Sequence, residues 1–308
     1  MPVLMKRAER GERPGSVSSP FLPQCGNPNC KSGWLRLWRS REVPVFEGKW
    51  VCSTVCAREM IEAAVLREAR DGNLSPAMHQ HRVPLGLLLF SKGHITQEQL
   101  KRALEAQKKA GSGRLGEWLV RQKAVEQEQL VRALGAQWGC PVLSADIFHA
   151  AAMAPALPRL LADSFGALPL RVAGRSLLYV AFESRPDPCI ALALERMTGL
   201  KCETGILRDS EFERAHGALL RAPFPRVRLL ETTSLRGAAH AMTAMVEESR
   251  PAEARLVRVH NYFWLRLWKK SPSAGQKHSL PAAGDIEDMV CSFSTEFRWC
   301  SSGEESCR

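Results

Sequence analysis

Four cysteines near the start of the chain have the residue type and the spacing of a metal site. They form two close pairs, CGNPNC at residues 25–30 and CSTVC at residues 52–56. Four thiolates spaced in this way suit tetrahedral zinc, and a helix that begins at the second pair favours the thiolate form and fixes the ligand directions. The sequence therefore predicts one zinc ion bound by Cys25, Cys30, Cys52 and Cys56.

A small unit over residues 21–70 must position these cysteines. The expected order is a knuckle at CGNPNC, two strands at WLRLW and VPVFEGKW, the second cysteine pair and a helix. A unit with so few aliphatic residues needs a cross-link such as a structural metal ion to stay folded. This disfavours the alternative of four unconnected cysteines. The unit resembles a treble-clef finger, a fold that serves DNA, RNA and protein binding alike. Its basic residues would either contact phosphate or form a solvated face; they are Arg36, Arg39, Arg41 and Lys49.

Two similar segments follow, PLGLLLFSKGHITQEQLKRALEAQ at 84–107 and RLGEWLVRQKAVEQEQLVRALGAQ at 114–137. Their apolar residues are spaced as the inner faces of two short helices joined by a tight turn. Thr96 and Gln99 predict a capping box. The glycine of each LG pair lies where a helix start leaves backbone N–H groups open to a phosphate or a planar ring. A duplicated helical hairpin is the expected fold, and it accounts for the leucines even without a ligand.

This tandem pattern resembles the N-terminal domain of the type II secretion and type IV pilus assembly ATPases in its MshEN form. The resemblance continues through FGALPLRVAGRSLLYVAF, DPCIALALERMTGL and DSEFERAHGALL, so that it covers residues 83–220. In that family the motif binds cyclic di-GMP through a loop arginine, backbone groups and leucine side chains. The nucleotide-binding residues that the resemblance implies are Arg82, Leu85, Gly86, Leu89, Gly93, Gln107, Arg114, Leu115, Gly116, Leu119 and Gln137.

The two copies depart from the family pattern at different positions. Pro84 stands where the first copy should have an arginine, and Lys123 stands where the second copy should have a glycine. The first copy therefore lacks a planar cationic group at this position, and Arg82, two residues earlier, is the candidate substitute. The second copy keeps Arg114 and its glycine, leucines and glutamine. We expect weak or degenerate cyclic di-GMP binding, with a purely structural or partner-docking role as the alternative.

Composition and periodicity divide the remainder of the chain. The predicted division is a disordered lead at 1–20, the zinc unit at 21–70, a linker at 71–82, the secretion-ATPase N-terminal-like domain at 83–225 with its α+β part at 139–225, a helix plus β-hairpin extension at 229–268, and a disordered tail at 269–308. The expected fold class is α+β: a small four-cysteine zinc finger, a tandem helical-hairpin repeat, then a small α/β sandwich.

WLRLW occurs twice, at 34–38 and 264–268. In a strand this pattern puts Trp, Arg and Trp on one face and the two leucines on the other. It predicts either a strand at a sheet edge or a groove for a peptide or partner. Among the other cysteines, Cys140, Cys189 and Cys202 are expected to be core residues, and no role is assigned to Cys291, Cys300 and Cys307 of the tail. The histidines at 149, 216, 240 and 260 are expected to be isolated.

Composition and motifs also limit the classes of function that the chain could have. A net charge of +11 over 308 residues permits nucleic acid, nucleotide phosphates or acidic partners. No apolar stretch approaches the roughly 20 residues of a membrane-spanning helix, and the start lacks a secretory signal, so we expect a cytoplasmic protein without membrane insertion. We find no GxxxxGK[ST] phosphate loop and no histidine spaced for a catalytic set. The sequence thus predicts a protein that is not an enzyme.

Together these features predict a non-enzymatic adaptor or regulator that acts on a protein partner, such as secretion or pilus machinery. Zinc is its expected cofactor, and cyclic di-GMP its expected weak ligand. The alternative is a nucleic-acid-binding regulator, with the zinc finger as the contact and the middle domain as a sensor. A degenerate enzyme would need a cofactor that the sequence does not indicate.

Overall fold

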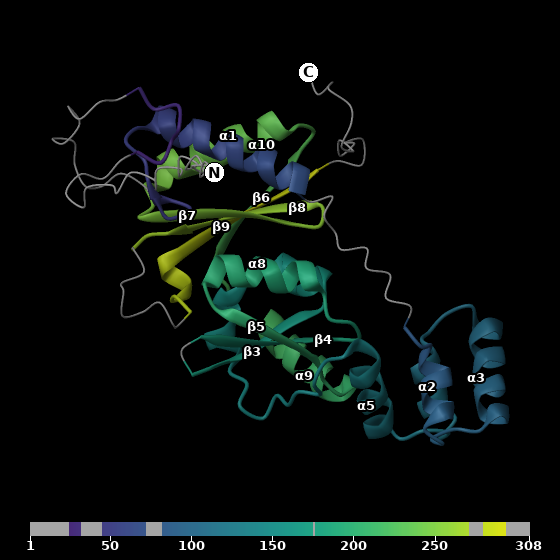
Figure 1. The fold of residues 1–308 in the computed structure, drawn as a ribbon. Coiled ribbons are helices and arrows are strands. Elements are labelled where there is room, and N and C mark those ends of the chain that lie inside the picture. The colour runs from purple at the N-terminus through teal and green to yellow at the C-terminus, as the bar shows by residue number, and fades with distance from the viewer. Residues whose placement is uncertain (1–24, 32–44, 72–81, 175, 271–279, 294–308) are drawn as a thin grey trace, which may run out of the picture.

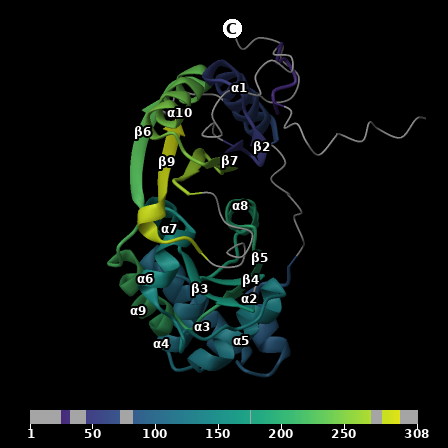
Figure 2. The same ribbon diagram turned by 90° about the vertical axis from the view of Figure 1, so that its left-hand side faces the viewer.

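The computed structural model describes residues 25–31, 45–71, 82–174, 176–270 and 280–293. These residues form a six-stranded sheet, a three-stranded sheet and helices that lie between and around them (Figures 1 and 2). The α+β class is confirmed. The lead at 1–20, most of the linker at 71–82 and the WLRLW copy at 34–38 lie outside the described residues.

The six-stranded sheet combines strands from both ends of the chain. Its strand order is β2-β1-β7-β8-β9-β6. Neighbouring strands are antiparallel except for two parallel pairs, β1 with β7 and β6 with β9. The bounds are β1 (Val45–Phe46), β2 (Lys49–Trp50), β6 (Arg226–Thr232), β7 (Glu253–Val259), β8 (Tyr262–Trp268) and β9 (Ile286–Phe293).

Helices α1 (Thr54–Asp71) and α10 (Leu235–Ser249) cover one face of this sheet (Figure 1). The buried residues of α1 recur at helical spacing, as Ala57, Ile61, Ala64 and Val65, and they share a core with α10 and with strands β7, β8 and β9. The cysteine-bearing unit therefore adds two strands and a helix to the C-terminal sheet. It does not fold as a separate body.

Helix α8 (Pro188–Thr198) lies between the two sheets, on the opposite face of the six-stranded sheet (Figure 1). Asp187 accepts hydrogen bonds from the backbone N–H groups of Cys189 and Ile190 at the start of this helix. Gly199, with φ of 74°, ends it in the left-handed conformation. One core joins α8 to Trp264 of the six-stranded sheet and to the three-stranded sheet. That sheet has the order β3-β4-β5, with β3 (Ala167–Ala173), β4 (Leu177–Phe182) and β5 (Lys201–Ile206).

The tandem segments form two helical hairpins at one side of the molecule (Figure 1). The capping box of Thr96 and Gln99 is confirmed. The second copy has the same arrangement with Glu126 and Gln129. The hairpin helices are α2 (Leu85–Ser91), α3 (Gln97–Ala110), α4 (Leu115–Arg121) and α5 (Gln127–Trp138). The other short elements are α6 (Ala150–Met153), η2 (Ala154–Ala156), α7 (Arg159–Ser164), α9 (Asp209–Leu220) and η3 (Ala283–Asp285).

Two expectations about the C-terminal part were wrong. The predicted disordered tail at 269–308 contains strand β9, in which Cys291 is fully buried. The WLRLW copy at 264–268 lies in the central strand β8, with every residue buried, so it forms neither a sheet edge nor a groove. The sequence did not predict strand β9 because polar residues interrupt its apolar pattern. Its charged residues are paired with arginines inside the fold, which the sequence does not indicate.

Candidate functional site

The four predicted zinc ligands lie together. Their sulfur atoms are all within 4.8 Å of one another. Cys30 Sγ lies 3.5 Å from Cys52 Sγ, which lies 3.6 Å from Cys56 Sγ. A tetrahedral ion with zinc–sulfur bonds of about 2.3 Å separates its sulfur ligands by about 3.8 Å. The donor set and its spacing therefore fit a structural zinc ion.

Neighbouring residues hold this cysteine cluster in place. The backbone N–H of Gly26, in the segment between Cys25 and Cys30, donates to the carbonyl of Trp50 at 2.7 Å. This bond ties the first cysteine pair to β2. The buried Asn27 donates its side-chain amide to Glu59 of α1 at 2.7 Å. Burial raises the pKa of the Cys25 thiol to about 12. A bound cation would supply the positive charge that buried thiolates need.

The leucines of the tandem motif point into the helical bundle. Leu89 and Leu119 are fully buried, and Leu85 and Leu115 pack against the same core. In this conformation the two fully buried leucines would support a ligand without contacting it.

The glycines of the motif have two distinct roles. Gly86 is buried within α2, and a Cβ there would lie 2.6 Å from Leu100 Cδ1. A Cβ at Gly116 would lie 3.0 Å from the Leu130 side chain. These two glycines allow close packing of helices. Gly93 instead has φ of 70°, and its counterpart Lys123 has φ of 55°, so the second copy holds a lysine where the backbone favours glycine.

The two glutamines at the ends of the copies make reciprocal contacts. Gln107 of the first copy donates to the carbonyl of Gly113, which precedes the head of the second copy, at 2.8 Å. Gln137 of the second copy donates at 2.8 Å to the carbonyl of Val83, just before the head of the first copy. Each copy is thus tied to the other, which gives the glutamines a structural role.

Arg114, at the head of the second copy, contacts a loop of the α+β part, and Arg82 stacks on a tryptophan that also lies beside this loop. Arg114 Nη2 lies 2.9 Å from Glu183 Oε1, and both side chains are about half exposed. The guanidinium of Arg82 stacks 3.9 Å from the ring centre of Trp138, and that of Arg185 lies 5.4 Å from it. Residues 183–185 therefore contact the second-copy arginine and share Trp138 with the substitute arginine of the first copy.

A groove of about 680 Å³ lies between the second copy and the α+β part. Arg114 and Arg185 line it together with five carboxylates, those of Glu117, Asp163, Glu183, Asp209 and Glu213. Burial, together with neighbouring carboxylates, raises the pKa of Asp209 although Arg114 opposes the shift. The carboxylates outnumber the guanidinium groups, so the groove opposes an anionic ligand.

His260, which the sequence suggested was isolated, is bound to a carboxylate. Its Nε2 lies 2.7 Å from Asp187 Oδ2, and its ring stacks on Phe165 with centres 4.7 Å apart. Cys189 lies close enough to complete a three-ligand group. A nitrogen and an oxygen bound to one tetrahedral metal would be about 3.3 Å apart, so the shorter contact describes a direct hydrogen bond. The two residues lie on separate elements, and no sequence spacing indicated this pair.

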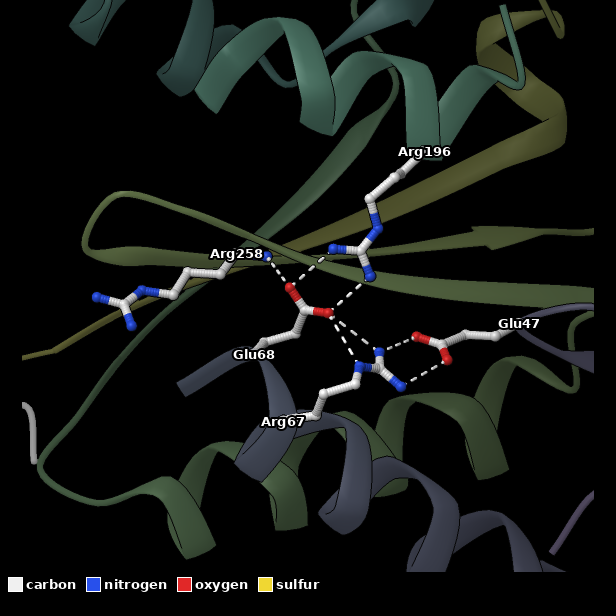
Figure 3. Close-up of polar contacts among 5 residues, drawn as sticks. All are labelled: Glu47, Arg67, Glu68, Arg196 and Arg258. Atoms are coloured by element: carbon white, nitrogen blue, oxygen red, sulfur yellow. Dashed lines mark hydrogen bonds and ion pairs between the residues drawn. The ribbon is translucent and has the colours of Figure 1, made fainter. Parts of the chain in front are cut away.

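Glu68 was also missed by the sequence reasoning. It follows the buried positions 57, 61, 64 and 65 of α1 at helical spacing, and only 4% of its side chain is exposed. It binds Arg67 and Arg196 (Figure 3). A glutamate at an apolar position of a helix was the signal that could have identified it.

Within the described residues, no helix is both long and apolar enough to cross a membrane. No protein-family profile matches the chain.

The chain has detectable relatives over less than half of its length. Over 133 residues, or 42% of the chain, it is 29% identical to the type IV pilus assembly ATPase PilB of Myxococcus xanthus, and the match spans 23% of that relative. A structure of MshE with cdg is 28% identical and matches 44% of this chain and 98% of that chain, with a TM-score of 0.37. The N-terminal domain of XpsE is 18% identical and matches 44% and 92%, with a TM-score of 0.32. The sequence match to PilB confirms the resemblance to secretion and pilus ATPases.

Proposed function

We propose that this protein is a non-enzymatic cytoplasmic adaptor or regulator related to the N-terminal domains of type II secretion and type IV pilus ATPases. The likeness to PilB supports this most directly, because it takes in 42% of this chain but only 23% of the ATPase. The shared part would serve to contact secretion or pilus machinery. Affinity purification of the full chain from its host, followed by mass spectrometry, tests the proposal. Enrichment of those components over a mock purification from cells without the tagged chain supports it, and their absence contradicts it.

Cyclic di-GMP is the proposed ligand of the tandem motif, at low affinity. The resemblance of the motif suggests this ligand, while three features of the structure weaken its site. Arg114 is already paired with Glu183, the adjoining groove is rich in carboxylates, and Pro84 supplies no guanidinium at the head of the first copy. A missing charge-assisted hydrogen bond costs about 1.5 to 3 kcal/mol, which is about tenfold to a hundredfold in affinity.

Calorimetry with cyclic di-GMP on the full chain tests this ligand. We expect weak or undetectable binding by the natural sequence and tighter binding by the double variant Pro84→Arg with Lys123→Gly. The double variant leaves the net charge unchanged, and Glu203→Gln, at an exposed position of β5, serves as a control for a non-specific effect of added positive charge. Submicromolar binding by the natural chain would show that the two departures are compensated. No gain in the double variant would remove cyclic di-GMP as the reason for the repeat.

Zinc is the proposed ion of the four-cysteine cluster, in which it would be held by four thiolates and supply folding energy to the N-terminal unit. Elemental analysis of protein purified without chelator should give about one equivalent per chain, because closed four-cysteine sites bind zinc tightly at neutral pH. Metal far below one equivalent in a metal-replete preparation would exclude the site.

The nucleic-acid alternative has less support. Helix α1, which follows the second cysteine pair, packs on α10 and the sheet. Arg67 at its C-terminal part is bound by Glu47 and Glu68. Binding to DNA measured at increasing salt distinguishes the two functions, because phosphate contacts give a steep loss of affinity with salt. Such a slope would favour the alternative.

A further inference from the structure

Helix α1 connects the cysteine cluster to an ion-pair network around the buried carboxylate of Glu68 at its other end. Cys56 lies in its first turn and Glu68 in its last, a separation of about 18 Å at 1.5 Å per residue. Between them Ile61 and Val65 are fully buried against the sheet and α10. Because the intervening turns are packed, a movement at one end of this helix is transmitted to the other.

The strands of the cysteine-bearing unit give a second connection. The segment of the first cysteine pair, residues 25–30, is hydrogen-bonded to β2 through Gly26 and Trp50. In the turn between β1 and β2, Glu47 accepts two hydrogen bonds from the guanidinium of Arg67, at 2.6 and 3.0 Å. Arg67 in turn donates to Glu68 at 3.0 and 3.2 Å. The cluster thus reaches Glu68 both along the helix and through the hairpin turn, whose Glu47 is joined to Glu68 by Arg67 (Figure 3).

Glu68 binds the helix that lies between the two sheets. Arg196 of α8 donates to both of its carboxylate oxygens, at 2.6 and 3.0 Å, and the backbone N–H of Arg258 in β7 donates at 3.1 Å (Figure 3). Burial by itself would raise the pKa of Glu68, but these bonds and that from Arg67 outweigh it and lower the pKa. A buried carboxylate is tolerated only while its cationic partners stay in place.

The carboxyl-terminal end of α8 has further ties to β7. Arg255 donates to the carbonyls of Arg196 and Met197 at 3.1 and 3.2 Å. The apolar side of α8 belongs to the core that reaches the three-stranded sheet. A change in Glu68 therefore alters the helix on which the α+β part packs.

We propose that Glu68 couples the four-cysteine metal centre to α8, so that metal binding tightens α8 against the six-stranded sheet. This inference rests on the proposed zinc site. The coupling is reciprocal, because any contact that favours bound metal must itself be favoured by the metal. Loss of Arg196, which lies outside the cysteine-bearing unit, therefore weakens metal binding.

Hydrogen exchange of the full chain, with and without a chelator, tests the coupling. In the natural protein, metal removal should speed exchange in α8 by about tenfold or more, as expected for a local stability change of about 1.4 kcal/mol. In Glu68→Gln, exchange in α8 should be fast already and insensitive to the chelator. Glu62→Gln, an exposed site on the same helix, should behave as the natural protein does.

Metal affinity provides a measurement that does not depend on the folding of the Glu68 variant. Competition with a chromophoric chelator should show several-fold weaker zinc binding in Arg196→Gln. The control Leu192→Ala, at an exposed position of α8, should leave affinity unchanged. Equal affinities in Arg196→Gln and the natural chain, or α8 exchange unaffected by metal removal, would overturn the coupling. Zinc content measured on the same samples separates these outcomes from failure of the zinc site itself.

Discussion

Arg266 of β8 and Asp288 of β9 form a buried, two-point ion pair. Nε and Nη2 of the arginine donate to the two carboxylate oxygens at 2.8 and 2.9 Å, and the side chains are 1% and 0% exposed. The indole of Trp264 also donates to Asp288, and Arg266 donates to the carbonyl of Ala156. Through this bond to Ala156, the pair joins the six-stranded sheet to the short helix η2.

Breaking this pair should be strongly destabilising. Asp288→Asn leaves the arginine charge buried without its counter-charge, and we expect the free energy of unfolding to fall by about 3 kcal/mol or more. Urea unfolding followed by tryptophan fluorescence measures the change. Glu128→Gln, which removes an exposed pair with Arg132, should cost less than about 0.5 kcal/mol. Similar losses in the two variants would contradict the assigned role of burial.

Lys123→Gly should stabilise the repeat. Lys123 has φ of 55°, a conformation that costs a residue with a side chain about 1 kcal/mol relative to glycine. We expect a gain of about that size in urea unfolding. Gln122→Gly, at the neighbouring position with φ of −81°, should be neutral or destabilising. A gain in the control, or none in Lys123→Gly, would show that backbone strain is absent.

The contact of Asp187 with His260 should make stability depend on pH. Burial alone would raise the pKa of Asp187, but the hydrogen bond and charge of His260 and two backbone N–H bonds outweigh it, so the pKa is lowered. A carboxyl with a lowered folded pKa contributes stability above its unfolded pKa of about 3.9, and loses it as pH falls through the folded value. Asn keeps the helix cap, so Asp187→Asn removes only the charge.

We therefore expect the stability difference between the natural chain and Asp187→Asn to shrink as the pH falls below about 4. Urea unfolding at a series of pH values measures it. Asp146→Asn, at an exposed site, should show no such dependence. A difference that persists unchanged at the lowest pH would mean that the charge of Asp187 is not the stabilising element.

Metal removal should destabilise α10 and the C-terminal strands as well as the cysteine-bearing unit. The buried Cys52 and Cys56 belong to the core that contains α10 and the C-terminal strands. Chelation and Cys52→Ser should therefore lower the thermal midpoint by similar amounts, without adding, and both should expose α10 to hydrogen exchange. Cys140→Ser, outside the cluster, should leave the effect of the chelator intact. Protection of α10 in the metal-free protein would show that the two parts unfold independently.

Local patterns in the sequence determined most of the helices and strands and the four-cysteine cluster. The alternation of apolar residues, Thr96 with Gln99, and Asp187 before Pro188 act on nearby backbone, so the strands of the α+β part, the repeat helices and their caps follow from neighbouring residues. The two cysteine pairs likewise identified the sulfur cluster, because short loops fix the directions of ligands within each pair.

Tertiary structure alone decided which distant elements meet. β1 pairs with β7 although about two hundred residues separate them, and β9 joins the same sheet although its charged residues resembled a solvated segment. Glu68 with Arg196, Asp187 with His260, and Asp288 with Arg266 acquire partners only when the chain folds. Spacing along a sequence indicates which residues are neighbours on one element, whereas the pairing of buried charges depends on how sheets and helices pack. That packing decided how the cysteine cluster and α8 are joined.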